Sequence, residues 1–227
     1  AYRALIEGLP EEGRLIACGD SEDVRALCGS ARCPVTRYGF EPGNDVVIEM
    51  LSPGSEGGRF RVRETDGAWR ELRLGVWGAH NALNATAVWL AARAEGVPVE
   101  RVGAALAGFH GVKRRLEELG RPGDVVVVDD FAHHPTEVRA SIGGLRERYP
   151  KRRVTIVLEP RSLTAGRDFF FDDWVAALRL ADRVVLAPIF HAERLGSQGL
   201  DLAALADRLC AQGVAARACG GQEEVVE

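Results

Sequence analysis

One short run, Val125 to Asp130, constrains the fold of this chain more than any other, because four consecutive valines precede two aspartates. Four β-branched apolar residues in a row are typical of a strand that is buried on both faces inside a parallel sheet. Pro135 lacks an amide N–H and suits the first turn of a helix, and apolar residues then recur with helical spacing from Val138 to Tyr149. We therefore predict a buried parallel strand, a polar turn and a helix over residues 136–148.

The alternation of strand and helix patterns continues to the end of the chain. Further strand patterns lie at residues 154–158, 183–187 and 214–217, and helices are expected through residues 174–178 and 200–209. This order predicts an α/β domain with a parallel, doubly wound sheet, in which the strand at 154–158 lies beside the valine strand. Sheets of this kind bind their ligands at the carboxyl edge.

The polar residues that follow these strands are therefore expected to meet at one edge. They are Asp129, Asp130, His133 and His134, together with residues 159–162 and 188–191. A carboxylate just past a strand fits a ribose diol, and the histidines could stack on a nucleotide or simply cap the helix. Arg161 and Ser162 suit a substrate carboxylate, although an ordinary surface loop explains them equally well.

The first part of the chain has a different pattern of apolar and polar residues. Between residues 35 and 74, short alternating stretches are separated by turn signals at 53–58 and 66–67, which predicts a β-meander with one solvated face. A helix rich in small residues follows Gly78. Asn81 and Asn84 are three positions apart near its start, where amides could read a base edge or bind an anion. The alternative is that Asn81 caps the helix and Asn84 is solvated.

Composition excludes several classes of function. The chain has 227 residues, 46% hydrophobic and 27% charged, with a net charge of −4, which is typical of a soluble globular protein. No long block of Lys or Arg favours nucleic acid or a membrane surface as a partner, and no apolar run approaches the roughly 20 residues of a membrane span. Five scattered cysteines without a Cys-x-x-Cys pair indicate reduced thiols in a cytoplasmic protein.

Neither a metal site nor a phosphate-binding P-loop is predicted from the residues. The adjacent histidines beside adjacent aspartates invite a metal interpretation, but neighbouring positions point in different directions and no third ligand comes at a suitable spacing. The chain also contains no G-x-x-x-x-G-K-[ST] motif. Three cations at 113–115 could contact phosphates, or could simply be solvated.

Four motifs in order resemble those of the Mur ligases, the ATP-dependent amide-bond-forming enzymes of peptidoglycan synthesis. They are Gly78-x-His-Asn-x-x-Asn84, Phe109-x-Gly-Val-Lys-Arg-Arg-Leu-Glu117, Asp129-Asp-Phe-Ala-His-His-Pro-Thr136 and Glu159-Pro-Arg-Ser162. Phe131-Ala132 and the last motif favour the murein peptide ligase branch, which joins a murein tripeptide to UDP-N-acetylmuramate during recycling, over the branch that adds L-alanine.

The resemblance implies two domains. Residues 1–111 are similar to the C-terminal part of the central ATPase domain, and residues 112–227 to the Rossmann-like C-terminal domain. The family's sugar-nucleotide domain and the P-loop half of its central domain fall outside this sequence, so we expect a fragment that is inactive by itself.

The resemblance also implies the roles of individual residues. His80, Asn81 and Asn84 match the motif at the adenine side of ATP, and Arg115 matches an arginine that reaches the phosphates and acts in catalysis. Asp130 matches the ribose-binding aspartate, with His133 or His134 beside the nucleotide. Arg161 and Ser162 lie where the family receives its amine substrate.

The implied mechanism begins when ATP phosphorylates the lactyl carboxylate of UDP-N-acetylmuramate, and the amine of the tripeptide then attacks the acyl phosphate. Arg115 and Mg²⁺ would stabilise the negative charge, with most magnesium ligands outside this sequence. Three alternatives remain open: the L-alanine-adding ligase, another ligase of the superfamily such as a folate-type polyglutamate ligase, and a binding module without catalysis.

Overall fold

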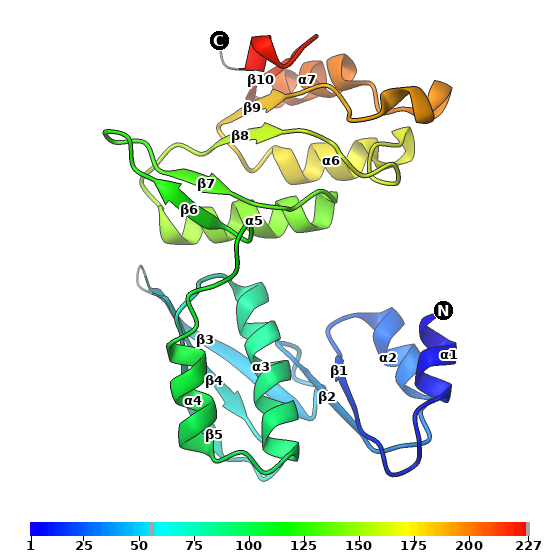
Figure 1. Cartoon of the computed structure of the whole chain (residues 1–227), viewed down its shortest axis with the longest axis vertical. Coiled ribbons are helices and arrows are strands. Elements are labelled where there is room, and N and C mark those ends of the chain that lie inside the picture. The colour runs from blue at the N-terminus through cyan, green and yellow to red at the C-terminus, as the bar shows by residue number, and fades with distance from the viewer. Residues whose placement is uncertain (55–56, 226–227) are drawn as a thin grey trace. The chain divides into compact units, whose positions relative to one another are not determined.

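The computed structural model of the chain describes residues 1–54 and 57–225. The chain divides into two compact units, Ala1–Gly111 and Val112–Glu227. Among the described residues, the first unit contains one sheet and the second unit contains two (Figure 1). Each unit has its own hydrophobic core.

The first unit is built on a five-stranded sheet with the order β1-β2-β3-β4-β5. Its strands are β1 (Leu15–Cys18), β2 (Val35–Gly39), β3 (Val46–Gly54), β4 (Gly57–Arg63) and β5 (Trp69–Leu74). The predicted meander is confirmed for β3, β4 and β5, which pair antiparallel, whereas β1, β2 and β3 pair in parallel. Of the predicted turn at 53–58, residues 55 and 56 lie outside the described residues.

The side chain of Asp20 helps to explain why β3 continues in the direction of β2. Its carboxylate accepts hydrogen bonds from the backbone N–H groups of Phe40 (2.9 Å) and Glu41 (3.0 Å) and from the side-chain amide of Asn44 (2.9 Å). These bonds hold the connection between the two strands in a compact loop. Strand β3 therefore begins beside the end of β2 and runs onward in parallel, with Tyr38 opposite Val46.

Helices α3 (Ala79–Ala94) and α4 (Val99–Ala107) pack on this sheet, while α1 (Tyr2–Glu7) and α2 (Glu22–Cys28) lie near β1 (Figure 1). The small residues of α3 include the buried Ala82 and Ala85, which let the helix approach the strands closely. Trp89 on the same helix is 0% exposed, and its indole N–H donates to Glu64 at 3.1 Å. Within the part of the chain that the structure describes, no helix combines the length and apolar composition needed to cross a membrane.

The second unit contains a parallel three-stranded sheet with the order β10-β9-β8. Its strands are β8 (Thr155–Leu158), β9 (Arg183–Leu186) and β10 (Ala215–Ala218), and its helices are α5 (Pro135–Arg148), α6 (Phe171–Leu178) and α7 (Leu202–Ala211). Short 3₁₀ turns lie at Asp168–Phe170, Ala192–Arg194, Gly196–Gln198 and Glu223–Val225. The predicted alternation of strands and helices is confirmed for β8, β9, β10 and for α5, α6 and α7, whereas the 3₁₀ turns were not predicted. Trp174, Leu178 and Leu186, each 0% exposed, lie in the core between the helices and the sheet.

The valine run departs from the prediction. Strand β7 (Val127–Asp129) pairs antiparallel with β6 (Glu117–Gly120) in a separate two-stranded sheet, and β8 pairs with β9 instead. Val125 is 61% exposed and Val127 is 41% exposed, so the prediction of a buried strand beside β8 is wrong. The apolar run does mark an extended segment. Its partner is the strand next to it in sequence, because pairing across a short turn closes a small loop at low entropic cost.

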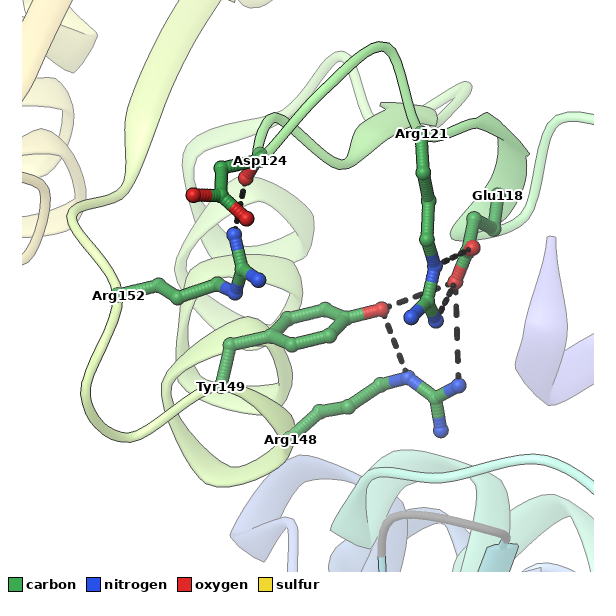
Figure 2. A network of polar contacts seen from close by, with 6 residues as sticks. All are labelled: Glu118, Arg121, Asp124, Arg148, Tyr149 and Arg152. Atoms are coloured by element: carbon green, nitrogen blue, oxygen red, sulfur yellow. Dashed lines mark hydrogen bonds and ion pairs between the residues drawn. The ribbon is translucent and has the colours of Figure 1, made fainter.

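A polar network joins this hairpin to the carboxyl end of α5 (Figure 2). The carboxylate of Glu118 on β6 accepts hydrogen bonds from Arg121 (3.0 Å) and from the hydroxyl of Tyr149 (3.1 Å). That hydroxyl in turn accepts from Arg148 at 2.9 Å, and Arg152 donates to the backbone of the turn between the two strands. The network fixes the exposed hairpin to the helix that follows it.

Candidate functional site

The amino end of α3 carries the candidate residues of the first unit. Gly78 precedes the helix with φ of 98°, and a Cβ there would lie 2.7 Å from the imidazole of His80, so this ring lies against bare glycine backbone. Asn81 donates its side-chain amide to the carbonyl of Trp77 at 2.8 Å, and Asn84 is exposed. Because Gly78 holds the N-cap position, the alternative is wrong in having Asn81 cap the helix, whereas the exposed Asn84 agrees with its other part. Asn81 is therefore fixed in place, and Asn84 is open to a ligand.

Two adjacent arginines at the start of the second unit meet one aromatic ring. The Cζ atom of Arg114 lies 5.0 Å from the ring centroid of Phe131, and that of Arg115 lies 5.8 Å away. Arg114 also pairs with Asp129 at 3.4 Å, and its carbonyl accepts the N–H of Phe131 at 2.8 Å. Arg114 has φ of 58°, a left-handed conformation that is costly for a residue with a Cβ. These contacts hold Arg114 in place and leave Arg115 exposed beside the ring.

Asp130 directly follows β7 and is partly buried. Its Oδ2 atom accepts a hydrogen bond from the hydroxyl of Ser141 on α5. Among the described residues, Oδ1 accepts no side-chain or backbone hydrogen bond. One oxygen of this carboxylate is thus anchored, while the other can accept a hydrogen bond from a ligand.

The two histidines play different structural parts. His134 is the N-cap of α5, where its Nδ1 accepts the N–H of Thr136 at 3.3 Å, so Nδ1 carries no proton in this arrangement. Its ring also meets Phe170 edge-on, with centroids 4.8 Å apart. His133 lies 3.5 Å from Glu137 through Nδ1. Of the two histidines, His134 therefore caps the helix and His133 does not.

Glu137 lies in the first turn of α5 and holds the segment before the helix. Partial burial by itself raises the pKa of Glu137. Four effects outweigh it: hydrogen bonds from the backbone N–H groups of His133 and His134, and the charges of His133 and Arg115. The pKa of Glu137 therefore falls below its usual value. The N–H of His133 donates to this carboxylate at 3.0 Å. Glu137 therefore carries its negative charge at neutral pH and faces both His133 and Arg115.

A second group of side chains lies where β8 and β9 end. The Cζ atom of Arg161 lies 4.4 Å from the ring centroid of Phe190, and its Nε is 3.4 Å from Glu159. The hydroxyl of Ser162 accepts the N–H of Ala165 at 3.3 Å, so this serine begins a turn. The predicted approach of residues 159–162 to residues 188–191 is confirmed by this stack and by the backbone hydrogen bond from Phe190 to Pro160 (3.1 Å).

The expected meeting of all these residues at one sheet edge is only partly realised. Within the described part of the chain, no hydrogen bond or ion pair joins the Asp129–His134 segment to the Glu159–Ser162 segment, because β7 is paired with β6 and not with β8. The described residues also contain no group of three or more His, Cys, Asp or Glu side chains that could hold a metal ion.

Comparisons with known proteins agree with this two-unit organisation. The family model of the Mur ligase middle domain matches residues 1–92, and that of the Mur ligase, glutamate ligase domain matches residues 114–227, which is half of the chain. The chain belongs to the Mur ligase family. This membership confirms the fold expected from the four motifs.

Curated relatives of this Mur ligase chain include the UDP-N-acetylmuramate–L-alanine ligase of Acidithiobacillus ferrooxidans, which is 35% identical over 221 residues, 96% of this chain and 47% of the relative. The chain thus spans about half the length of the curated relatives that it matches.

Two examples represent the solved structures that share the fold. The murein peptide ligase of Psychrobacter arcticus matches 99% of this chain and 47% of its own, with a TM-score of 0.68 and 24% identity. The MurF ligase of Thermotoga maritima, solved in complex with ADP, matches 98% of this chain and 54% of its own, with a TM-score of 0.67 and 20% identity.

Sequence reasoning assigned no site role to four residues of this Mur ligase chain that contact the candidates. Phe131 and Phe190 each lie under an arginine, while Ser141 and Glu137 each hold a neighbouring candidate in place. Glu137 carried a signal, because a glutamate in the first turn of a helix commonly bonds back to the preceding backbone. Whether an arginine stacks on a ring depends on the rotamers of its side chain, and the spacing of residues in the sequence does not reveal those rotamers.

Proposed function

We propose that this chain is part of an ATP-dependent ligase that joins the amine of a murein tripeptide to the lactyl carboxylate of UDP-N-acetylmuramate. ATP would activate the carboxylate as an acyl phosphate, which the amine then attacks. Membership of the Mur ligase family supports an ATP-dependent ligation. Because the reaction would use ATP and a sugar nucleotide, we propose a cytoplasmic location.

The nucleotide part of the proposal depends on one observation: the carboxylate of Asp130 and the guanidinium of Arg115 are each only partly engaged by other side chains. Asp130 keeps one carboxylate oxygen for a ligand while Ser141 holds the other, and this suits a ribose hydroxyl, which needs an acceptor. Arg115 is exposed beside Phe131, whereas Arg114 next to it is paired with Asp129. A guanidinium placed in this way suits a phosphate, and it would stabilise the negative charge that develops during transfer.

In the first unit, His80, Asn81 and Asn84 would serve the adenine side of the nucleotide. The exposed amide of Asn84 can both donate and accept hydrogen bonds, as a base edge requires. Asn81 gives one of its N–H groups to Trp77 and would act through its remaining donor and its oxygen. The described residues contain no group of three or more His, Cys, Asp or Glu side chains that could hold a metal ion, and most ligands of the proposed Mg²⁺ would lie outside this sequence, so no step is assigned to a metal here.

The substrate pocket is proposed for the ends of β8 and β9. Arg161 presents a guanidinium above Phe190, a placement suited to a substrate carboxylate, and the proposed tripeptide carries several carboxylates. The hydroxyl of Ser162 accepts a backbone bond, so its proton is available to the same group.

An L-alanine-adding ligase is the second candidate, because the relative from Acidithiobacillus ferrooxidans with 35% identity carries that name. The loop Glu159-Pro-Arg-Ser162 favours the tripeptide. The two candidates share ATP and the acyl donor, UDP-N-acetylmuramate, and differ only in the amine that accepts the acyl group.

The deciding experiment measures phosphate release by the full-length protein with ATP, Mg²⁺ and UDP-N-acetylmuramate, with either the tripeptide or L-alanine as the amine. We expect kcat/KM to be higher for the tripeptide. Turnover with L-alanine alone would assign the chain to the second candidate. The 227-residue chain by itself, which lacks a P-loop motif, is expected to release no phosphate above background under either condition.

A further inference from the structure

The guanidinium of Arg161 rests on a ring that the proposed function does not use. Phe190 follows β9, whereas Arg161 follows β8, and the Cζ atom of Arg161 lies 4.4 Å from the centroid of that ring. Phe190 remains 39% exposed although it is apolar, so burial alone does not account for its position. The ring and the guanidinium cover each other at the carboxyl edge of the parallel sheet.

The backbone and neighbours of Phe190 hold the ring in place. Its N–H donates to the carbonyl of Pro160 at 3.1 Å, which ties the end of β9 to the residue before Arg161. The imidazole of His191 packs edge-on against the ring with centroids 4.0 Å apart. His191 itself has φ of 58° and bonds to Glu193 at 2.9 Å. A backbone conformation that is costly for histidine is thus maintained beside this ring.

Among the described residues, no other contact holds the guanidinium of Arg161 comparably well. Its ion pair with Glu159 is 3.4 Å long, and the arginine side chain is 50% exposed, so water and salt weaken the pair. A long exposed side chain with a weak partner samples many rotamers. Stacking on a fixed ring restricts the guanidinium plane, and bidentate binding of a carboxylate depends on the orientation of that plane.

We propose that Phe190 is a positioning residue, which orients the guanidinium of Arg161 for the carboxylate of the incoming amine substrate. This inference rests on the proposed function, because it assumes that Arg161 receives that carboxylate. Glu159 contacts the guanidinium at Nε, and the substrate would bind the terminal nitrogens.

The first test replaces Phe190 in the full-length protein and compares saturation curves for the amine substrate and for ATP. Phe190→Leu keeps an apolar side chain but removes the ring, so KM for the amine should rise about 2- to 5-fold, the scale of one exposed cation–π contact. KM for ATP and kcat should change less than about twofold. Phe190→Tyr keeps the ring and should restore the amine KM, whereas a Tyr variant as impaired as the Leu variant overturns the role of the ring.

Phe169 offers a matched control. It is a phenylalanine of the same unit, 64% exposed, and it packs on Phe170 and on no arginine among the described residues. Phe169→Leu should leave both KM values unchanged. An equal rise of the amine KM in Phe169→Leu and Phe190→Leu would mean that losing any exposed ring perturbs the unit, and it would overturn the proposal.

The second test combines Phe190→Leu with Arg161→Lys, which keeps the charge but loses the fork. If Phe190 acts through Arg161, the double variant should have the amine KM of Arg161→Lys alone, within about twofold. Effects that multiply would show that Phe190 acts independently of Arg161, and they would overturn this inference while leaving the ligase assignment intact. If the full-length protein ligates neither the tripeptide nor L-alanine, the proposed function fails first and this inference fails with it.

Discussion

The hydroxyl of Ser141 donates a hydrogen bond to the Oδ2 atom of Asp130, so a helix holds a carboxylate that stands at the end of a short exposed strand. Strand β7 has one partner strand and lies outside the parallel sheet, which makes it a poor support for a binding residue. Helix α5, in contrast, packs on α6 and contributes Val138 and Ile142 to the core. Asp130 therefore takes its fixed position from the helix more than from the strand.

Replacing Asp130 with alanine in the full-length protein should weaken ATP binding while leaving the amine KM nearly unchanged. A ribose hydroxyl would lose a charged acceptor, which costs about 1.5–3 kcal/mol, or roughly 10- to 150-fold in the ATP constant. ATP analogues that lack one ribose hydroxyl provide the control, because their affinity should depend less on this substitution. An unchanged ATP constant would remove Asp130 from the nucleotide site.

Gly78→Ala should destabilise the first unit by about 1–3 kcal/mol, because alanine tolerates positive φ poorly and its Cβ would press on the ring of His80. Gly96→Ala is the matched control: Gly96 also has positive φ, 75°, but a Cβ there meets nothing within 4 Å. Thermal melts of the two variants separate backbone strain from the clash. Equal losses of stability would show that the contact with His80 contributes nothing.

Glu118 should make stability depend on pH in the acid range. The hydrogen bond from Arg121 lowers the pKa of Glu118 to about 2 against the opposing effect of burial, with further lowering by Tyr149 and Arg148. Because the pKa is lower in the folded state, the stabilisation is complete above the ordinary value of 4.5 and disappears as the pH falls towards about 2.

The measurement is the difference in melting temperature between the chain and its Glu118→Gln variant at several pH values. At pH 7 the variant should be less stable by about 0.5–1 kcal/mol, as expected for an exposed charge network. The difference should shrink between pH 4.5 and pH 2. A constant difference would mean that the charge of Glu118 does not stabilise the hairpin.

Trp174→Ala should strongly destabilise the second unit. Trp174 is 0% exposed, and its indole N–H donates to the carbonyl of Ala165 at 2.8 Å. Loss of a buried tryptophan costs about 3–5 kcal/mol, and the carbonyl also loses its partner. Urea unfolding measures the loss, with Trp69→Ala as the control, since Trp69 is 41% exposed and its removal should cost about 1 kcal/mol or less. Equal losses would contradict the central packing role of Trp174.

From the valine run onwards, the order of strands and helices in the second unit could be predicted from local patterns, because each segment carries its own periodicity, whereas β6 was not predicted. Helix α5 illustrates this: Pro135 lies at its first position, and Val138 and Ile142 face the core. The meander of β3, β4 and β5 followed in the same way from alternation and turn residues, and the motifs around Asn84 and Asp130 identified the family.

Tertiary structure decided which strands pair and how the candidate side chains are held. The valines at 125–128 predicted a buried strand, yet β7 pairs with β6 and remains partly exposed, because apolar character does not specify a partner. Ser141 beneath Asp130 and Phe190 beneath Arg161 lie 11 and 29 residues away along the chain, respectively. The sequence by itself therefore determined the α-helices and most strands of the second unit, the meander of the first unit and the family. Pairing and side-chain support arise only when segments distant in the chain pack together, so they depend on the folded arrangement and not on any local pattern.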